Sequence, residues 1–325
     1  MKEMNLELLK ALYSVHSPSM QEKKMRRFLK RYITDNVPSA CIKQDENGNL
    51  LVTKGEAERY PCLCAHMDQV QDFHPKDFVC IEDHGVIFGY SPKTHKQCGL
   101  GADDKNGIFV ALTCLQKYDA LKCAFFVGEE IGCVGSSAAD VSFFDDCIFC
   151  AQIDRRGNSD MVTNISWQDL CSAEFVADVN CTAWGYRISD GLSTDVAALR
   201  GNGVTASCVN LSCGYYEPHT DREFTVIEDL QKCYAFVCHL IKDCTGDYSF
   251  KSTERNTWDG WGRYDAASRE YDECLDVCCD MLQNYPEMSW DEFNQLVRGN
   301  YQRLKEDDLK DIYKTALSFV QTVDE

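Results

Sequence analysis

Hydrophobic and polar residues follow two different periods along the chain, and the alternation of these periods predicts an α/β fold. Apolar residues recur at helical spacing near residues 4–15, 22–32, 108–112 and 227–241, which predicts amphipathic helices there. Between these segments lie short apolar runs that end in polar groups, a pattern typical of buried strands. These runs are PCLCAHMD (61–68), KCAFFVGEEIG (122–132), DCIFCAQIDRRG (146–157) and GVTASCVNLS (203–212).

Turn residues predict two hairpins in the first third of the chain. Asn47-Gly48 separates two short strand patterns within residues 41–55. A second hairpin is expected around Asp83-His84-Gly85. It belongs to residues 71–98, a segment that has the character of an insertion between a strand and a helix.

Capping residues mark where helices are expected to begin. Ser19 is followed three residues later by Glu22, the pattern of a capping box, so the second helix is predicted to open there. Ser193 or Thr194 is expected to cap a short helix in GLSTDVAAL. Residues 159–185 carry no long period and are expected to form short strands and turns.

The pattern changes near Asp243. A polar, Trp-containing stretch, residues 247–265, lacks periodicity and predicts a linker or an irregular cover. Helix patterns follow it: one with Leu275, Cys278, Cys279 and Leu282, one opened by Ser289 with Glu292 as a capping box, and one with Leu309, Ile312, Ala316 and Leu317. The chain is therefore expected to end in a helical extension that packs against the core or a partner.

Charge and hydropathy restrict the partners. The 325 residues carry a net charge of −19. Nucleic acid and anionic membranes both require a basic face, so neither is expected as a partner. No apolar run reaches the about 18 residues of a membrane span, and the polar, periodic start does not resemble a secretory signal. We therefore expect a cytoplasmic protein.

The 20 cysteines fit a reducing compartment. Several of them, such as Cys62, Cys64 and Cys208, lie in apolar runs, where a thiol behaves as a small hydrophobic group. Cys147 and Cys150 form a CxxC pair inside a predicted strand. Because no second CxxC follows at the spacing of a zinc ribbon, the sequence favours packing over a structural zinc site.

The stretch GLGADDKNGIFVAL (99–112) is the centre of the candidate chemistry. Its glycines and double acid predict a tight loop that delivers Asp103 and Asp104 to the start of a helix. Taken alone, the two acids fit an ordinary helix cap equally well. Four other segments offer similar groups, however: His66 with Asp68, Glu129 with Glu130, Asp154, and His219. The first three of these groups end predicted strands, and His219 lies in a predicted loop. Since ligand sites in α/β sheets lie at the carboxyl ends of strands, we expect these side chains to form a zinc site.

Each residue also has a structural interpretation. Taken singly, His66 fits a buried structural histidine, and Glu129-Glu130 fits a solvated surface. Asp195 is a candidate for the surroundings of the site. Arg155 and Arg156 follow a candidate ligand directly and suit either a substrate carboxylate or nearby acids. The other histidines, which lack such neighbours, are expected to be structural or superficial: His16, His74, His84, His95 and His239.

Five motifs in order, CAHMDQV, GLGADDKNGI, VGEEIGCVGS, IDRRG and PHTDREFTVIEDL, resemble the metal-site motifs of the co-catalytic di-zinc exopeptidases. This group includes the peptidase T and glutamate carboxypeptidase enzymes and related zinc aminopeptidases. The resemblance covers roughly residues 5–243. It implies a three-layer α/β/α phosphorylase/hydrolase-like zinc-peptidase fold with a mixed sheet. It further implies a di-zinc hydrolase catalytic domain at 1–245, followed by a linker and α-helical extension at 246–325.

The resemblance also implies a role for each residue. The metal ligands would be His66, Asp103, Glu130, Asp154 and His219, around two Zn²⁺ ions, with Co²⁺ or Mn²⁺ as alternatives. Asp103 would bridge the ions and Asp68 would orient His66. Glu129 would act as the general base that deprotonates the water between the ions. The family holds the peptide bond after its bridging aspartate in cis, which predicts a cis Asp103–Asp104 bond.

One departure concerns the lid. Relatives with a lid insert a domain of about 100 residues before the last histidine, whereas Asp154 and His219 are only about 65 residues apart, so no full lid is expected. The histidine that stabilises the oxyanion from that lid then has no counterpart. Hydroxyl groups are the candidates to replace it: Tyr215, Tyr216, Ser193 and Thr194.

The sequence thus predicts a metal-dependent exopeptidase, aminopeptidase-like, acting on short peptides or terminal residues. Two alternatives stay open. The same activated water would suit an N-acyl amino acid amidohydrolase or deacetylase, so the substrate is a peptide or an acylated amino acid. A non-catalytic scaffold on the same fold is the other alternative. A homo-oligomer is compatible with either interpretation.

Overall fold

The computed structural model describes residues 4–165, 168–250, 271, 274–275, 277–279, 281–282, 287–298, 301 and 304–321, without the side chains of 318–321. The chain divides into two compact units, Met1–Thr253 and Glu254–Glu325.

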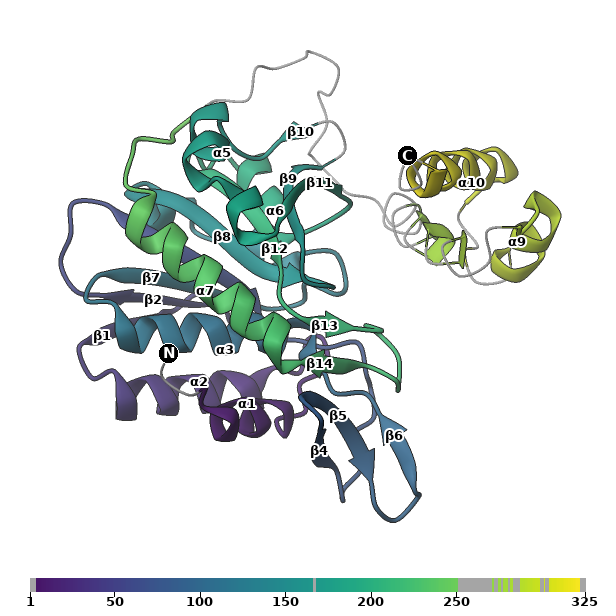
Figure 1. Ribbon diagram of the computed structural model, residues 1–325, viewed down its shortest axis with the longest axis horizontal. Coiled ribbons are helices and arrows are strands. Elements are labelled where there is room, and N and C mark those ends of the chain that lie inside the picture. Colours follow the sequence, from purple (N-terminus) through teal and green to yellow (C-terminus); the bar gives the residue numbers. More distant parts are fainter. Residues whose placement is uncertain are drawn as a thin grey trace. The chain divides into compact units, whose positions relative to one another are not determined.

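A mixed nine-stranded sheet forms the centre of the first unit among the described residues (Figure 1). Its strands run in the order β1-β2-β7-β3-β8-β12-β9-β10, and β11 pairs with β9. The bounds are β1 Ala40–Gln44, β2 Leu50–Lys54, β7 Leu121–Phe126, β3 Tyr60–His66, β8 Cys147–Arg155, β12 Ser207–Ser212, β9 Asp160–Ile165, β10 Gln168–Asp169 and β11 Arg187–Gly191. The four strands predicted from apolar runs, β3, β7, β8 and β12, are neighbours in parallel pairings at the middle of this sheet.

Helices cover both faces of the sheet. Their bounds are α1 Leu6–Tyr13, α2 Lys23–Asn36, α3 Ala102–Lys117, α4 Val134–Ser137, α5 Ala173–Val179, α6 Asp195–Gly201 and α7 Ile227–Asp243, with 3-10 turns at Val141–Phe144 and Cys181–Trp184. Buried residues of α1, α2, α3, α5 and α7 form one core with one face of the strands. Residues of α6 and the first 3-10 turn form a second core on the opposite face. This arrangement confirms the predicted α/β/α layers.

Alternation along the strands divides side chains between the two cores. On β3, Leu63 and Ala65 enter the core beneath α3, while Cys62 and Cys64 enter the core beneath α6. Because both faces are covered, the central strands are apolar throughout, which is why they appear in the sequence as continuous runs. Their polar residues are confined to their ends.

A smaller five-stranded sheet lies beside the large one among the described residues. It runs β13-β14-β5-β4, with β6 paired to β5. The bounds are β13 Tyr215–Tyr216, β14 Phe224–Val226, β5 Val86–Ser91, β4 Val79–Asp83 and β6 Lys96–Cys98. Residues 71–98 are therefore more than a separate insertion, because β5 pairs with β14 and so supports the loop that carries His219.

Both predicted hairpins are confirmed. β1 and β2 pair in antiparallel fashion across Asn47-Gly48, and β4 and β5 pair across His84-Gly85. His84 and Gly85 have φ angles of 49° and 83°, the left-handed conformation that such a tight turn requires.

Two local predictions were wrong. The capping box at Ser19 does not form: α2 begins at Lys23, the Ser19 hydroxyl donates to Asp68, and Glu22 accepts from the backbone of Met20. Within residues 159–185, expected to be strands and turns, the structure contains helix α5. Its first turn is capped by the Ser172 side chain, which accepts from the amide of Phe175.

The described residues of the second unit are mostly helical. α9 spans Trp290–Val297 and α10 spans Glu306–Gln321. The predicted capping box of Ser289 and Glu292 is present at the start of α9. The described residues between 271 and 282 are helical as well. Most of the predicted linker, residues 251–265, lies outside the described residues.

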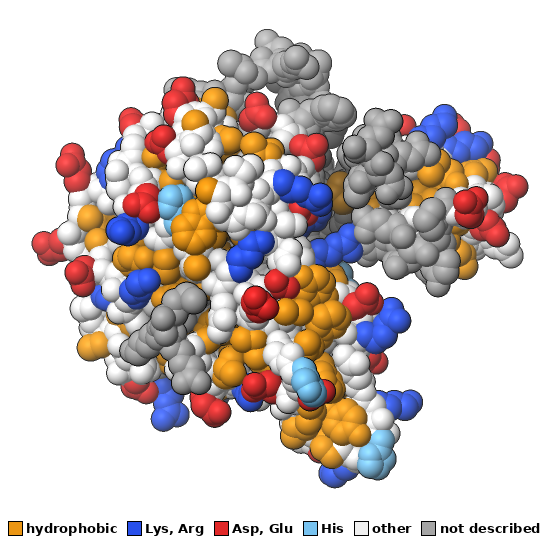
Figure 2. Space-filling model, viewed as in Figure 1, with side chains coloured by type: hydrophobic (Ala, Val, Ile, Leu, Met, Phe, Trp, Pro, Cys, Tyr) orange, Lys and Arg blue, Asp and Glu red, His pale blue; other side chains and the backbone are white. Residues whose placement is uncertain are grey.

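Charged side chains on the surface are mixed in sign. On the face that Figure 2 shows, Lys and Arg side chains alternate with Asp and Glu among the described residues, without the basic area that nucleic acid binding requires. A membrane-crossing helix, judged by length and apolarity, is likewise not found in the described part of the chain.

Candidate metal centre

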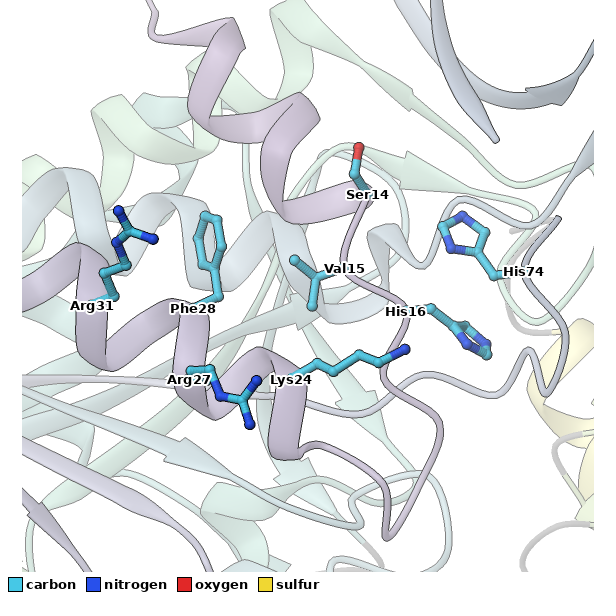
Figure 3. Close-up of a pocket in the computed structure, with 8 residues that line it drawn as sticks. All are labelled: Ser14, Val15, His16, Lys24, Arg27, Phe28, Arg31 and His74. Carbon is cyan, nitrogen blue, oxygen red and sulfur yellow. The ribbon is translucent and has the colours of Figure 1, made fainter. Parts of the chain in front are cut away.

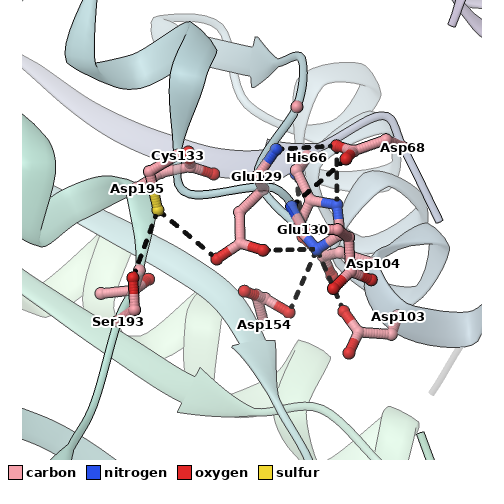
Figure 4. A network of polar contacts seen from close by, with 12 residues as sticks. His66, Asp68, Asp103, Asp104, Glu129, Glu130, Cys133, Asp154, Ser193 and Asp195 are labelled. Atoms are coloured by element: carbon pink, nitrogen blue, oxygen red, sulfur yellow. Dashed lines mark hydrogen bonds and ion pairs between the residues drawn. The ribbon is translucent and has the colours of Figure 1, made fainter. Parts of the chain in front are cut away.

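Acidic and imidazole side chains from five segments meet at the carboxyl ends of the central strands. Figure 4 shows four of these segments, with His66, Asp103, Glu129, Glu130 and Asp154 turned toward one another. The side chains come from the end of β3, the loop after β7, the end of β8, the start of α3, and the loop between β13 and β14. In that order they are His66, Glu129 and Glu130, Asp154, Asp103, and His219. The structure thus brings together the residues that the sequence singled out.

His66 is the most deeply buried member of this cluster, with 1% of its surface exposed. Its Nε2 lies 3.0 Å from Oδ1 of Asp103, 3.6 Å from Oδ1 of Asp154 and 4.0 Å from Oε2 of Glu129. On the other side of the ring, Nδ1 lies 3.4 Å from Oδ1 of Asp68. A carboxylate behind an imidazole in this way fixes the ring orientation and increases its basicity.

His219 approaches the cluster from the opposite side. Its Nε2 lies 3.0 Å from Oε2 of Glu130 and 3.4 Å from Oδ2 of Asp103. The side chain is 51% exposed, so this side of the cluster is open to solvent. His219 has a φ of 62°, and the loop that holds it is anchored by the pairing of β14 with β5.

The side chains form two ligand triads that share Asp103. One triad is His66, Asp103 and Asp154, and the other is Asp103, Glu130 and His219; within each triad the ligand atoms lie within 4.8 Å of one another. Asp103 presents Oδ1 to the first triad and Oδ2 to the second. Two triads joined by one carboxylate are an arrangement that could hold a pair of divalent cations.

The chemistry of the donors fits such cations. Oε1 of Glu130 is buried without a hydrogen-bond partner among the described residues. Buried carboxylates in this number repel one another and lose hydration, which is costly unless positive charge lies between them. Imidazole and carboxylate ligands of this mixture are those that Zn²⁺ accepts.

The pKa values show how strongly these groups interact. Burial raises the pKa of Glu129 and Asp154 well above the usual carboxyl range, and neighbouring carboxylates raise it further. Burial would lower the pKa of His219, but the carboxylates of Glu130 and Asp103 outweigh it and raise this pKa to about 12. Without metal, the side chains of the cluster therefore bind protons, which a cation would displace on binding.

The start of α3, together with the loop that precedes it, is held in an unusual conformation. The Asp103–Asp104 peptide bond is cis, as predicted, and Gly101 before it has a φ of 65°. The buried carboxylate of Glu223 accepts from the amides of Gly101 (2.5 Å) and Asp103 (3.0 Å). Asp104 accepts from the amide of His66 and thereby ties the loop to β3.

Glu223 and Asp104 were not given a role from the sequence. Both are buried acids that accept hydrogen bonds from backbone amides of the site or of the helix turn next to it, and Glu223 also accepts from the side-chain amide of Gln71. Glu223 lies in the PHTDREFTVIEDL motif, four residues after His219. The motif could therefore draw attention to Glu223, but its partner amides, about 120 residues away in the sequence, could not be predicted.

Asp68 connects three parts of the site. Its carboxylate lies behind His66 and also accepts from the amides of Glu129 (3.1 Å) and Glu130 (3.2 Å). The Ser19 hydroxyl donates to it at 2.8 Å. One buried carboxylate thus positions a histidine and both consecutive glutamates.

A polar network behind Asp154 sets its orientation. Gln152 donates to Asp154 at 3.1 Å and to Asp195 at 3.0 Å. The side chain of Asn210 accepts from the Asp154 amide and donates to its carbonyl. Burial raises the pKa of Asp195 to about 7. The structure therefore connects Asp195 to the site through Gln152, in the surroundings where the sequence had suggested it.

The four hydroxyl groups suggested as oxyanion donors have partners. Those partners are Asp154 for Tyr215, Asp229 for Tyr216, Cys133 for Ser193 and Gln152 for Thr194. Of the four, only Tyr215 contacts a predicted metal ligand, with its hydroxyl 3.3 Å from Oδ1 of Asp154.

Other charged candidates contact groups outside the site. Nε of Arg155 lies 3.7 Å from Asp160, a nearby acid. The remaining histidines have contacts with Gln71 (His16), Phe78 (His74), Asp83 (His84), Tyr90 (His95) and Asp243 (His239). None of these five belongs to either triad.

A hollow of about 480 Å³ lies apart from the triads, beside α2 (Figure 3). It is lined by Ser14, Val15, His16, Lys24, Arg27, Phe28, Arg31 and His74. None of the predicted ligands lines it, and its polar groups are cationic or neutral. The carboxylate cluster is therefore the candidate site for metal chemistry.

No protein-family model and no curated protein sequence matches the chain. Solved structures do. Aminopeptidase PepT from Bacillus cereus ATCC 10987 is 15% identical, with a TM-score of 0.59, over 74% of this chain and 98% of that one. A tripeptidase from Staphylococcus aureus subsp. aureus Mu50 is 17% identical, with a TM-score of 0.59, over 74% and 97%. The TET1 peptidase of Pyrococcus horikoshii, which assembles into a tetrahedron or a large octahedral shell, is 16% identical, with a TM-score of 0.52, over 73% and 98%. At these identities the likeness establishes the fold.

Proposed function

We propose that the protein is a metal-dependent exopeptidase, aminopeptidase-like, that removes a terminal residue from short peptides. The observation that carries this proposal is the pair of ligand triads joined by Asp103, with Glu129 beside them. The folds of an aminopeptidase and a tripeptidase are similar to this one, which supports the same reaction class.

The ligands divide between two cations. His66 and Asp154 would hold the first, Glu130 and His219 the second, and Asp103 would contact both. Two divalent ions at such a site, Zn²⁺ or alternatively Co²⁺ or Mn²⁺, lower the pKa of water toward neutrality and polarise a carbonyl group.

Glu129 suits the role of general base. Its Oε2 lies 4.0 Å from Nε2 of His66, so the carboxylate faces the space between the ligands without belonging to either triad. In the metal-free cluster, burial raises the pKa of Glu129. A carboxylate held beside the attacking water can accept its proton. Glu129 would take the proton of the attacking water and pass it to the leaving amine. Asp68 accepts a hydrogen bond from the Glu129 amide and would thereby hold the Glu129 carboxylate in position.

We further propose that residues 1–245 form the catalytic domain without a full lid and that 246–325 form a linker and helical extension. The segment between Asp154 and His219 supports this division, since it contains core strands and helices of the large sheet. We also propose a homo-oligomer, which the assemblies of the TET1 peptidase support. The native mass of the protein in solution tests this proposal.

The substrate is tested by a panel of short compounds. Aminoacyl anilides and dipeptides with a free amino terminus are expected to be hydrolysed, and N-acetyl amino acids to be inert. Activity should disappear after chelation and return with Zn²⁺, Co²⁺ or Mn²⁺. Hydrolysis of N-acetyl amino acids alone would establish the amidohydrolase alternative, which uses the same activated water. Metal binding without turnover of any compound would favour a scaffold.

Metal affinity is expected to rise with pH. Below its pKa of about 12, the metal-free His219 carries a proton that a cation must displace. Each displaced proton makes the dissociation constant fall about tenfold per pH unit. Competition with a chromophoric chelator at pH 6, 7 and 8, corrected for the protons of the chelator, measures this slope. An affinity independent of pH would contradict the protonated cluster.

A further inference from the structure

A second group of potential metal ligands lies in the core beneath α6. The Sγ atoms of Cys62, Cys147 and Cys150 lie within 4.8 Å of one another, and all three side chains are buried. They come from adjacent strands: Cys62 from β3, and the other two from β8. None of them belongs to the carboxylate cluster described above.

A β-bulge is responsible for the convergence. In a regular strand, Cys147 and Cys150 would point to opposite faces, since they are three residues apart. The register between β3 and β8 shifts, however: Tyr60 pairs with Cys147, but Pro61 pairs with Phe149. Ile148 is the extra residue, and the shift turns both thiols toward the same core. Bulges commonly re-aim a side chain in this way.

Cross-strand pairing then completes the group. Cys62 lies directly opposite Cys150 in the parallel register of β3 and β8. Cys64, two residues along β3, points to the same core, and its thiol interacts with those of Cys62 and Cys150. Three thiols with a fourth beside them match the ligand number of a tetrahedral thiolate site.

The spacing and the charge also suit a metal. Sulfur atoms bound to one Zn²⁺ at about 2.3 Å are about 3.8 Å apart, so the observed separations need only a small contraction. The Lys122 ammonium, which also pairs with Asp146, favours the thiolate forms of Cys62 and Cys147. Burial opposes ionisation of Cys62, but the neighbouring thiols and Lys122 outweigh it and lower its pKa well below the usual range.

We propose that Cys62, Cys147 and Cys150 bind one thiophilic metal ion, Zn²⁺ in the resting protein, with Cys64 as the fourth ligand. Binding releases the thiol protons to solvent and leaves the thiolates on the ion. The ion would fasten the start of β8 to β3, two of the strands that carry ligands of the catalytic cluster. It is a structural site, closed to solvent and distinct from the His and carboxylate ligands.

Cobalt substitution tests this site in the whole protein. Co²⁺ bound to thiolates has an intense charge-transfer absorption in the near ultraviolet, which imidazole and carboxylate ligands do not produce. The wild-type protein loaded with Co²⁺ is expected to show this absorption. Cys62→Ser and Cys150→Ser should each lose most of it, whereas Cys133→Ser, beside the carboxylate cluster, and Cys278→Ser, in the second unit, should keep it.

Metal analysis separates this site from the proposed catalytic one. Asp103→Asn, which damages both triads, is expected to retain about one zinc per chain, and adding Cys62→Ser should remove it. Absence of the thiolate absorption from wild type, or no zinc left in Asp103→Asn, would overturn the proposal and leave the thiols as packing groups. Persistence of the band in both cysteine variants would overturn it as well. Each of these three results leaves the exopeptidase proposal untouched.

Discussion

Replacing Asp103 with alanine is expected to remove both cations of the candidate centre and to reduce turnover by about 10⁴-fold or more. Asp103 presents one oxygen to each triad, so its loss takes a ligand from both at once. It also leaves two imidazoles facing each other across the gap with less negative charge between them. A 10⁴-fold loss corresponds to about 5.5 kcal/mol of transition-state stabilisation, which is within what metal catalysis supplies.

Metal content and turnover are to be measured on the same preparation. Asp119→Ala, an exposed acid after α3, makes the same change of charge and is expected to keep both metal and activity. Circular dichroism and the unfolding midpoint would show whether the fold survives. If Asp103→Ala bound two catalytic ions as tightly as wild type, the bridging role would be wrong.

The sequence revealed the site because the fold concentrates polar groups at strand ends. The apolar runs of β3, β7 and β8 each end next to a ligand, and covered parallel strands have few other places for a charged group. Asp103 was visible for a different reason, since glycines on both sides of a double acid predict a tight loop before a helix. The order of the five motifs then favoured a metal site over ordinary helix caps.

What the sequence could not supply depends on contacts between distant segments. Ser19 and Glu22 have the spacing of a capping box, yet the buried carboxylate of Asp68 competes successfully for the Ser19 hydroxyl. Tertiary hydrogen bonds of this kind override local propensity. The bulge at Ile148 was equally hidden, because a CxxC in a strand predicts two thiols on opposite faces unless the register of the neighbouring strand is known.

The hairpin of residues 71–98 shows the same limit at a larger scale. Its two strands were predicted from a local turn. Its structural role was not predicted, because that role depends on the pairing of β5 with β14, more than 130 residues later. That pairing places the loop with His219 over the carboxylates. A segment that looks inserted in the sequence is thus part of what assembles the second triad.

Glu129→Gln is expected to keep both cations and to lose about 10²–10⁴-fold of turnover, the usual contribution of a general base. The amide has the shape of the carboxylate but cannot accept the proton of the attacking water. Since Glu129 belongs to neither triad, metal content should match that of wild type. The Michaelis constant should change little, because the carboxylate acts on the water rather than on the peptide.

The neighbouring glutamate is the matched control. Glu130→Gln makes the same chemical change one residue later, but Glu130 is a triad member with one buried oxygen that lacks a partner. Glu130→Gln should therefore weaken binding of the second cation by more than about 100-fold. This loss exceeds the effect of replacing a residue that only hydrogen-bonds to a metal ligand. Excess Zn²⁺ should restore part of the turnover of Glu130→Gln and none of that of Glu129→Gln. Loss of metal from Glu129→Gln, or full turnover by that variant, would contradict the separate roles assigned to the two acids. Only a general base that does not bind the metal can lose turnover while it keeps the metal.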